Sequence, residues 1–281
     1  MSQTPQMFTG PGSQPSDEDG AELSYMPMPS EMMTFSAQHL PEKEDIEGLD
    51  QGIAALDAVL SALGGYKKDA PADIVDLSGL TAENLELINQ VLGEGEVSVV
   101  AGTTIQAQEA VLAGVWRVRV TDDAGNLLRD LIEVASFPTT VMTAAFVCAK
   151  DQIDIPDEFA PNVFNAPPLL PEINEHIPKA VAGALPHVIN LSLLPHTPED
   201  LGCLNDLLGR GDITILSRGY GNCRITSTQT KNVWWVQFYN SQDTMILNSI
   251  EITVMPEVAI AAPEDISDSA ERLGEILEVY R

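Results

Sequence analysis

Residues 81–99, TAENLELINQVLGEGEVSV, return in altered form at residues 197–215, TPEDLGCLNDLLGRGDITI. Seven of the nineteen aligned pairs are identical, including the opening threonines Thr81 and Thr197 and the glycines that follow the apolar run. A threonine before acidic residues is typical of a helix N-cap, and a glycine of a helix end. Each stretch therefore predicts a helix followed by a strand, and their similarity predicts an internal repeat.

The similarity extends on both sides of these stretches. Before each helix lies a short β-branched segment, at residues 74–78 and 188–192, which predicts a strand. Farther along, Trp116 aligns with Trp234. Each lies in a run whose side chains alternate between two faces and which ends in turn residues, a pattern typical of antiparallel hairpins. These features predict an α+β fold made of two tandem copies of a helix plus antiparallel-sheet unit.

The composition between these units suggests where they begin and end. We expect the first copy at residues 46–150 and the second at residues 171–281, joined by a proline-rich linker at residues 151–170. An apolar stripe at helical spacing predicts a C-terminal helix from about residue 264 to residue 280.

Residues 1–45 differ from the rest of the chain. They hold six prolines and six of the nine methionines, and they are acidic. Such a segment buries too little apolar surface to offset its chain entropy, so we expect an extended acidic Met/Pro-rich N-terminal tail. Methionine is also frequent on adaptable binding surfaces. The tail is therefore either disordered or a segment that docks on its own domain or on a partner.

The charge excludes several classes of function. The formal net charge is −28, which opposes binding to nucleic acid or to anionic lipid headgroups. No apolar run approaches the length of a membrane-spanning helix, so we expect no membrane insertion. The first basic residue is Lys43, which argues against a signal peptide, and we expect a cytoplasmic protein.

Strand alternation makes a prediction about two aromatic residues of the second copy. Trp234, Val236 and Phe238 form one face of a strand, which leaves Trp235 and Tyr239 on the other. An outward tryptophan must be covered. The cover is either another part of this chain or a partner, because tryptophan and tyrosine are common interface anchors.

Motifs for resident metals and nucleotides are missing from the sequence. The four histidines show no ligand spacing, and no CxxC pair exists. The GxG at Gly219 and Gly221 leads into a strand, whereas a dinucleotide loop opens a helix. No nucleophile–base set is visible either. We therefore expect no cofactor, no metal and no enzymatic activity.

Cys223 leaves two interpretations open. Arg224 follows it directly and Arg218 is near in sequence, and neighbouring cations lower the pKa of a thiol. A reactive thiolate would suit a thiol- or metal/cluster-handling assembly factor. The other interpretation is a small buried residue of a strand. The remaining cysteines, Cys148 and Cys203, are far away in sequence.

A set of short motifs resembles a known family. The tail carries GPGSQP at residues 10–15 and MPxxMxTF at residues 28–35. The second copy carries SRGYGNCRI at residues 217–225, VWWVQFYN at residues 233–240 and ILNSIE at residues 246–251. Together these motifs resemble the HupH/HyaF family of hydrogenase expression/formation proteins, called HoxQ in some operons. The first copy lacks the GYGNCR loop, so any role of that loop belongs to the second copy.

The resemblance implies a maturation factor of a nickel–iron uptake hydrogenase. It implies a chaperone that holds the precursor of the iron–sulfur small subunit, which carries a twin-arginine export signal, in the cytoplasm before assembly and export. It also implies a second accessory protein, thioredoxin-like and of the HupG/HyaE type. The candidate partner-binding residues are Gly10, Pro11, Gly12, Ser13, Gln14, Met32, Phe35, Tyr220, Asn222, Cys223, Arg224, Trp235 and Tyr239.

Overall fold

The computed structural model describes residues 40–68, 70–219 and 221–281. Most of the tail predicted at residues 1–45 lies outside these residues. Eight of the candidate residues also lie outside the described residues. They are Tyr220 and seven residues of the tail: Gly10, Pro11, Gly12, Ser13, Gln14, Met32 and Phe35.

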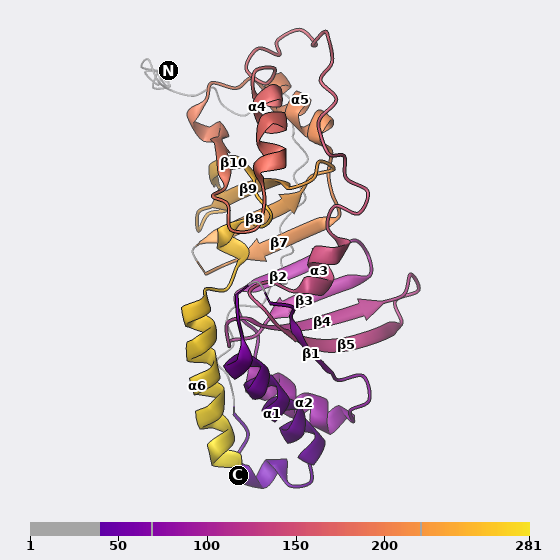
Figure 1. Cartoon of the computed structure of the whole chain (residues 1–281), viewed down its shortest axis with the longest axis vertical. Helices are drawn as coiled ribbons and strands as arrows, with labels where there is room; N and C mark the ends of the chain where they lie inside the picture. Colours follow the sequence, from indigo (N-terminus) through magenta and orange to yellow (C-terminus); the bar gives the residue numbers. More distant parts are fainter. Residues whose placement is uncertain (1–39, 69, 220) are drawn as a thin grey trace, which may run out of the picture. The chain divides into compact units, whose positions relative to one another are not determined.

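One antiparallel sheet organises the described chain (Figure 1). Its ten strands lie in the order β1-β5-β4-β3-β2-β7-β8-β9-β10-β6. The strands are β1 (Asp73–Asp76), β2 (Val97–Ala101), β3 (Ile105–Glu109), β4 (Val115–Thr121), β5 (Leu127–Val134), β6 (His187–Asn190), β7 (Ile213–Ser217), β8 (Asn222–Ser227), β9 (Val233–Tyr239) and β10 (Met245–Ile252). With the helices described next, this confirms the predicted α+β class.

Helices cover parts of the sheet. The described α-helices are α1 (Asp50–Gly65), α2 (Ala82–Leu92), α3 (Thr139–Ala144), α4 (Leu169–His176), α5 (Pro198–Leu208) and α6 (Pro263–Tyr280). Short 3₁₀ turns are η1 (Lys43–Ile46), η2 (Ile177–Lys179), η3 (Leu191–Leu193) and η4 (Glu257–Ala259). None of the helices in the described part is both long and apolar enough to cross a membrane.

The two halves of the sheet have the same strand order. In the first half a four-strand meander, β2 to β5, is followed outward by β1, and in the second half the meander β7 to β10 is followed outward by β6. The halves meet where β2 pairs with β7, and Val99 lies opposite Ile215. These two residues are also equivalent in the aligned stretches. The pairing is therefore centred on a local two-fold axis between them.

The central hydrophobic cluster lies across this axis on one face of the sheet. Val99 and Ile215 contribute to it, and the two fully buried indoles of Trp116 and Trp234 lie within it. Trp116 Nε1 donates to the Ala135 carbonyl at 3.1 Å, and Trp234 Nε1 donates to the carbonyl of Thr253, also at 3.1 Å. Both carbonyls belong to the turn that follows the last meander strand of the same half. Helix α3 and the turn η4 add side chains to this cluster.

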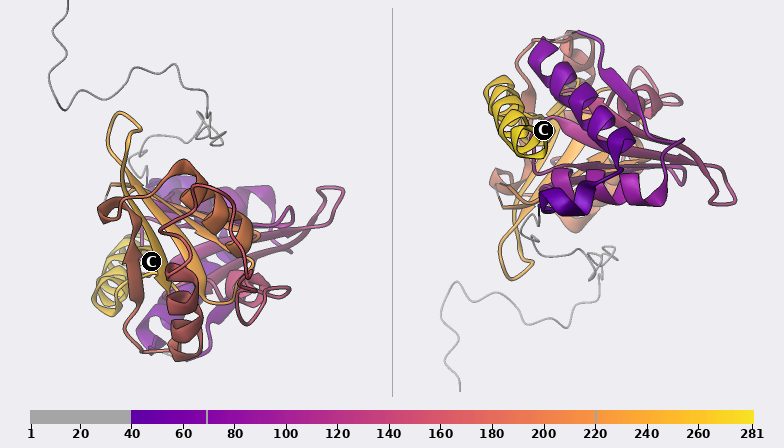
Figure 2. Two further views of the ribbon diagram at one scale, coloured as in Figure 1. Left: turned by 90° about the horizontal axis from the view of Figure 1, so that it is seen from above. Right: turned by 90° about the horizontal axis from the view of Figure 1, so that it is seen from below.

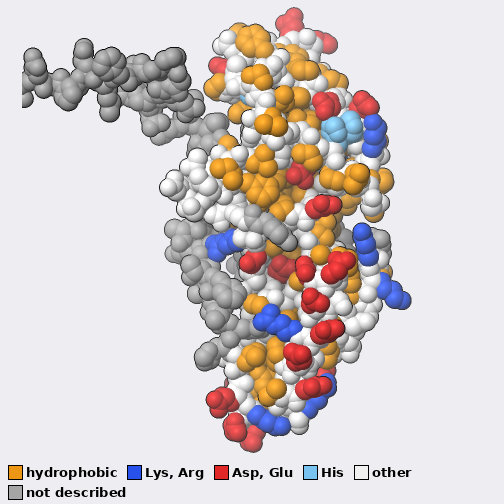
Figure 3. All heavy atoms as spheres, turned by 90° about the vertical axis from the view of Figure 1, so that its left-hand side faces the viewer, with side chains coloured by type: hydrophobic (Ala, Val, Ile, Leu, Met, Phe, Trp, Pro, Cys, Tyr) orange, Lys and Arg blue, Asp and Glu red, His pale blue; other side chains and the backbone are white. Residues whose placement is uncertain are grey.

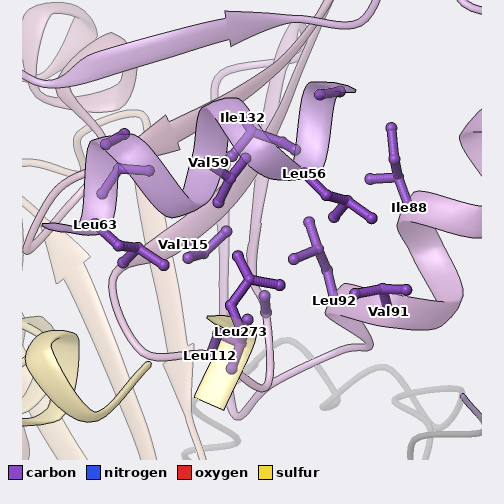
Figure 4. Close-up of a cluster of buried hydrophobic side chains, with 14 of the residues drawn as sticks. Leu56, Val59, Leu63, Ile88, Val91, Leu92, Leu112, Val115, Ile132 and Leu273 are labelled. Carbon is purple, nitrogen blue, oxygen red and sulfur yellow. The ribbon is translucent and has the colours of Figure 1, made fainter. Parts of the chain in front are cut away.

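Two further clusters lie under the helix pairs on the opposite face. By strand alternation, Val115 and Ile132 point to the face opposite Trp116. They belong there to a cluster that also takes side chains from α1, α2 and α6 (Figure 4). Helix α6 extends from the second half and packs beside α1 of the first half (Figure 2). The third cluster joins α4 and α5 to Val233 and Ile250.

Asp200 fixes the start of α5 and the segment that precedes α4. Its fully buried carboxylate forms a capping box with Thr197 and accepts hydrogen bonds from the N–H groups of Phe164, Asn165 and Ala166 at 2.8–2.9 Å. Burial favours the neutral acid, but these donors outweigh it and hold the pKa of Asp200 well below its usual range.

We expect the Asp200→Ala variant to lose about 2 kcal/mol of unfolding free energy at neutral pH, because a cap is lost and buried N–H groups are left without acceptors. Since the folded-state pKa is lowered, this contribution is present above the unfolded-state pKa and fades as the pH falls through the acid range. Urea titrations at neutral and acidic pH measure both effects. Glu199→Gln, an exposed charge change on the same helix, is the control; an equal loss in both variants would contradict the role of Asp200.

Candidate functional site

The GYGNCR motif forms the connection between β7 and β8. Gly221 has φ +101°, a conformation that side chains rarely adopt, which explains a glycine at this position. Asn222 and Arg224 lie on the face of β8 that also carries Tyr239 of β9. The Arg224 guanidinium lies 5.9 Å from the centre of the Tyr239 ring. The structure therefore brings these three candidate residues together.

Cys223 lies on the opposite face of β8, and its surroundings favour the interpretation of a small buried strand residue over that of a reactive thiolate. Its side chain is 3% exposed and belongs to the central hydrophobic cluster. Burial, with a smaller effect of the Glu251 carboxylate, raises the pKa of the Cys223 thiol to about 12. Arg224 does not offset this because successive residues of a strand point to opposite faces. Cys223 is the small buried strand residue of the other interpretation.

Thiol labelling tests this assignment. We expect N-ethylmaleimide to modify the exposed Cys148 rapidly in the native protein and Cys223 only after unfolding, because the reagent needs an accessible thiolate. Mass spectrometry of digested samples would locate the label at each time point. A Cys148→Ser variant serves as the control, and fast native labelling of that variant at Cys223 would contradict the assignment.

Trp235 is covered by this chain. It is half-buried and packs against the third cluster, under α4 and α5. Its Nε1 donates to Asn248 Oδ1 at 2.5 Å. Another part of this chain therefore covers part of the indole, and partner binding through Trp235 stays a prediction. Tyr239 is also half-buried, and its hydroxyl donates to Gln237 Oε1 at 3.2 Å.

A cleft of about 960 Å³ opens near the junction of the two halves. It lies beside the ends of β2, β3 and β7 and the first turn of α6. Its lining draws on residues 66–68 and 70, on the segments 181–186 and 253–263 and on the loop position Gly219. On the face presented by α6, acidic side chains follow the helix and hydrophobic ones gather beyond its N-terminal end (Figure 3). The cleft thus combines apolar walls with nearby carboxylates.

Glu96 connects the cleft to the GYGNCR loop. Its backbone carbonyl accepts a hydrogen bond from the Arg218 N–H at 3.2 Å. Its carboxylate lies so close to Gly219 that a Cβ built there would approach Glu96 Oε2 to 2.3 Å. A larger residue at position 219 would therefore have to displace the exposed Glu96 side chain from this place at the cleft.

Glu109 is the most perturbed carboxyl group of the cleft. Burial raises its pKa to about 7; a hydrogen bond from the Gly114 N–H opposes the shift, and the Glu96 and Asp265 charges add to it. At the position related by the local two-fold axis, β8 carries Ser227, whose hydroxyl accepts from the Ile213 N–H at 3.0 Å. At this pair of equivalent positions the carboxyl group is therefore present in the first half and replaced by a hydroxyl in the second.

The pH dependence of stability tests this description. Because the folded-state pKa of Glu109 lies above its usual 4.5, the group stabilises the fold at low pH, and this contribution is lost as the pH rises through about 7. We expect Glu109→Gln to gain roughly 1–3 kcal/mol over the native protein at about pH 8 and little at about pH 5. Denaturant titrations measure the difference. Glu275→Gln, which changes an exposed residue of α6, is the control, and its stability should depend on pH as that of the native protein does.

Sequence reasoning missed this cleft, because its carboxylates come from distant parts of the chain. It also missed the stacking of His176 on His187, whose ring centres lie 3.5 Å apart, and the contact of His187 Nε2 with Glu172 Oε1 at 2.8 Å. Across residues 40–68, 70–219 and 221–281, no group of three or more His, Cys, Asp or Glu side chains is arranged to hold a metal ion.

Comparison with known proteins places the chain in a family. Residues 51–151 and 163–280 match the model described as HupH hydrogenase expression protein, C-terminal conserved region. The chain belongs to the HupH family of hydrogenase expression/formation proteins, as the motifs indicated.

Relatives match over almost their whole length. The hydrogenase expression/formation protein HupH of Rhodobacter capsulatus is 46% identical over 99% of this chain and 98% of its own. HoxQ of Cupriavidus necator is 45% identical over 98% of this chain and 96% of its own. The hydrogenase-1 operon protein HyaF of Escherichia coli is 33% identical over 99% of this chain and 97% of its own. None of these names indicates an enzyme. The solved structure of HupH from Thiobacillus denitrificans shares 32% identity over 40% of this chain and 92% of that one, with a TM-score of 0.37.

Proposed function

We propose that this protein is a non-enzymatic, cytoplasmic maturation chaperone for the iron–sulfur small subunit of a nickel–iron uptake hydrogenase. It holds the precursor before assembly and export. The names of the full-length relatives support a role in hydrogenase expression and formation. The observation that carries the chaperone role is the cleft, which offers apolar walls and carboxylates and holds no recognisable catalytic set.

The charge of the chain suits such a client. At −28 the protein attracts a basic segment, such as the twin-arginine export signal, and repels acidic bystanders. The attraction weakens as salt screens it. We also propose that a thioredoxin-like protein of the HupG/HyaE type acts beside it on the same precursor.

The domain organisation is part of the proposal. We infer that residues 46–150 and 171–281 are two copies of one unit, with residues 151–170 as their linker. The equal strand order of the halves, the pairing of Val99 with Ile215 and the matching indole hydrogen bonds support this inference. Residues 1–45 with their candidate motif at Gly10–Gln14 are proposed as a further client-contacting segment.

A binding measurement tests the proposed client. We expect the full-length protein and the small-subunit precursor to co-elute from a size-exclusion column as a complex with the summed mass by light scattering, under anaerobic, low-salt conditions. A precursor whose paired arginines are replaced by glutamine should bind more weakly, because its charge complementarity is reduced.

Two controls define the result. The precursor without its export signal shows whether the signal carries the contact. The mature large subunit, mixed in the same way, shows whether binding is selective. If neither form of the precursor binds, the proposed function is wrong.

A further inference from the structure

We propose that the cleft beside β2, β7 and α6 is the docking site for an apolar segment of a client polypeptide that carries an arginine or lysine side chain. This inference rests on the proposed function and names the chemistry of the partner that the cleft accepts.

Exposed apolar side chains at the cleft are the first observation. Leu185 is 91% exposed, Val181 is 60% exposed and Ile260 is 38% exposed, and all three line the cleft. Large apolar groups that gather around one concavity mark an interaction site, because leaving them in water is unfavourable. Burying these side chains under an apolar segment would supply the main driving force for docking.

The size of the cleft favours a chain segment. Its volume of about 960 Å³ lies at the upper end of the range for small-molecule sites. Its lining comes from both halves of the sheet and from the start of α6, so several consecutive side chains of an extended or helical segment can contact it together. A polypeptide fits such an open, composite surface better than one compact ligand.

The charges of the cleft favour a docked segment that carries a cationic side chain. Glu96, Asp265 and Glu109 all line the cleft, and the negative charges of the first two disfavour ionisation of Glu109. A cation placed among them would relieve this repulsion and gain hydrogen bonds to charged acceptors. The charged groups that line the cleft are Glu96, Glu109, Glu257, Asp265, Lys67 and Lys68. Since acids outnumber bases, an apolar segment with a cation is favoured over one with an acid.

A labelled peptide tests the proposal on the full-length chain. The probe is a fluorescein-labelled synthetic peptide of about twelve leucine, alanine and serine residues with one arginine. In the first companion peptide glutamine replaces the arginine, and in the second serine replaces the leucines. We expect fluorescence anisotropy at low salt to give the arginine–leucine peptide an affinity at least about tenfold higher than either companion.

Variants locate the binding site. We expect Glu96→Gln and Asp265→Asn each to weaken binding of the arginine peptide about tenfold and to leave the glutamine peptide unchanged, because only the charged contact is removed. Leu185→Ser should weaken both peptides. Glu275→Gln, an equal charge change on the exposed side of α6, should weaken neither. Thermal melts confirm that each variant is folded.

The outcomes separate this inference from the proposed function. Equal binding of all three peptides to the unmodified protein overturns the inference without any variant, as does an equal loss in Glu275→Gln and Glu96→Gln. If the precursor forms a complex with the protein while the arginine peptide does not bind, the cleft assignment fails and the chaperone role stands. If the peptide binds as expected and the precursor does not, the proposed client is wrong.

Discussion

The pairing of β2 with β7 is the constraint on which the rest of the structure depends. Five residue pairs, from Val97 with Ser217 to Ala101 with Ile213, turn two five-stranded halves into one sheet. Without this pairing both strands would expose unpaired N–H and C=O groups at an open edge. The central hydrophobic cluster, which takes side chains from both strands, would also be cut in two. The hydrogen bonds between β2 and β7 and the burial of the central hydrophobic cluster therefore stabilise each other.

Local signals in the sequence predicted much of this fold. Thr81 and Thr197 do cap their helices, and the inward direction of Trp234 follows from strand period alone. The proximity of Arg224 in sequence did not indicate the surroundings of the Cys223 thiol, because Arg224 points to the other face of the strand. The cleft was beyond such reasoning, since Glu96, Glu109 and Asp265 meet only after β2, β3 and α6 have packed. Helix caps and strand faces can be predicted from neighbouring residues, whereas the meeting of residues from distant segments cannot.

The family motif gains a physical explanation from its surroundings. The loop after β7 passes close to the Glu96 carboxylate at Gly219 and then turns through a positive φ, which favours a glycine at position 221. Gly221 thus has a structural role in the motif, and Asn222 and Arg224 lie with Tyr239 on the face of the sheet opposite the central hydrophobic cluster.

The departure from two-fold symmetry has a consequence for stoichiometry. Glu109 on one side of the axis corresponds to Ser227 on the other, and α6 packs beside α1 of the first half. At this pair of equivalent positions only the first half carries a carboxyl group, among the residues that the structure describes. If the cleft beside α6 is the docking site, this asymmetry predicts one client segment per molecule, although the strand order of the two halves matches.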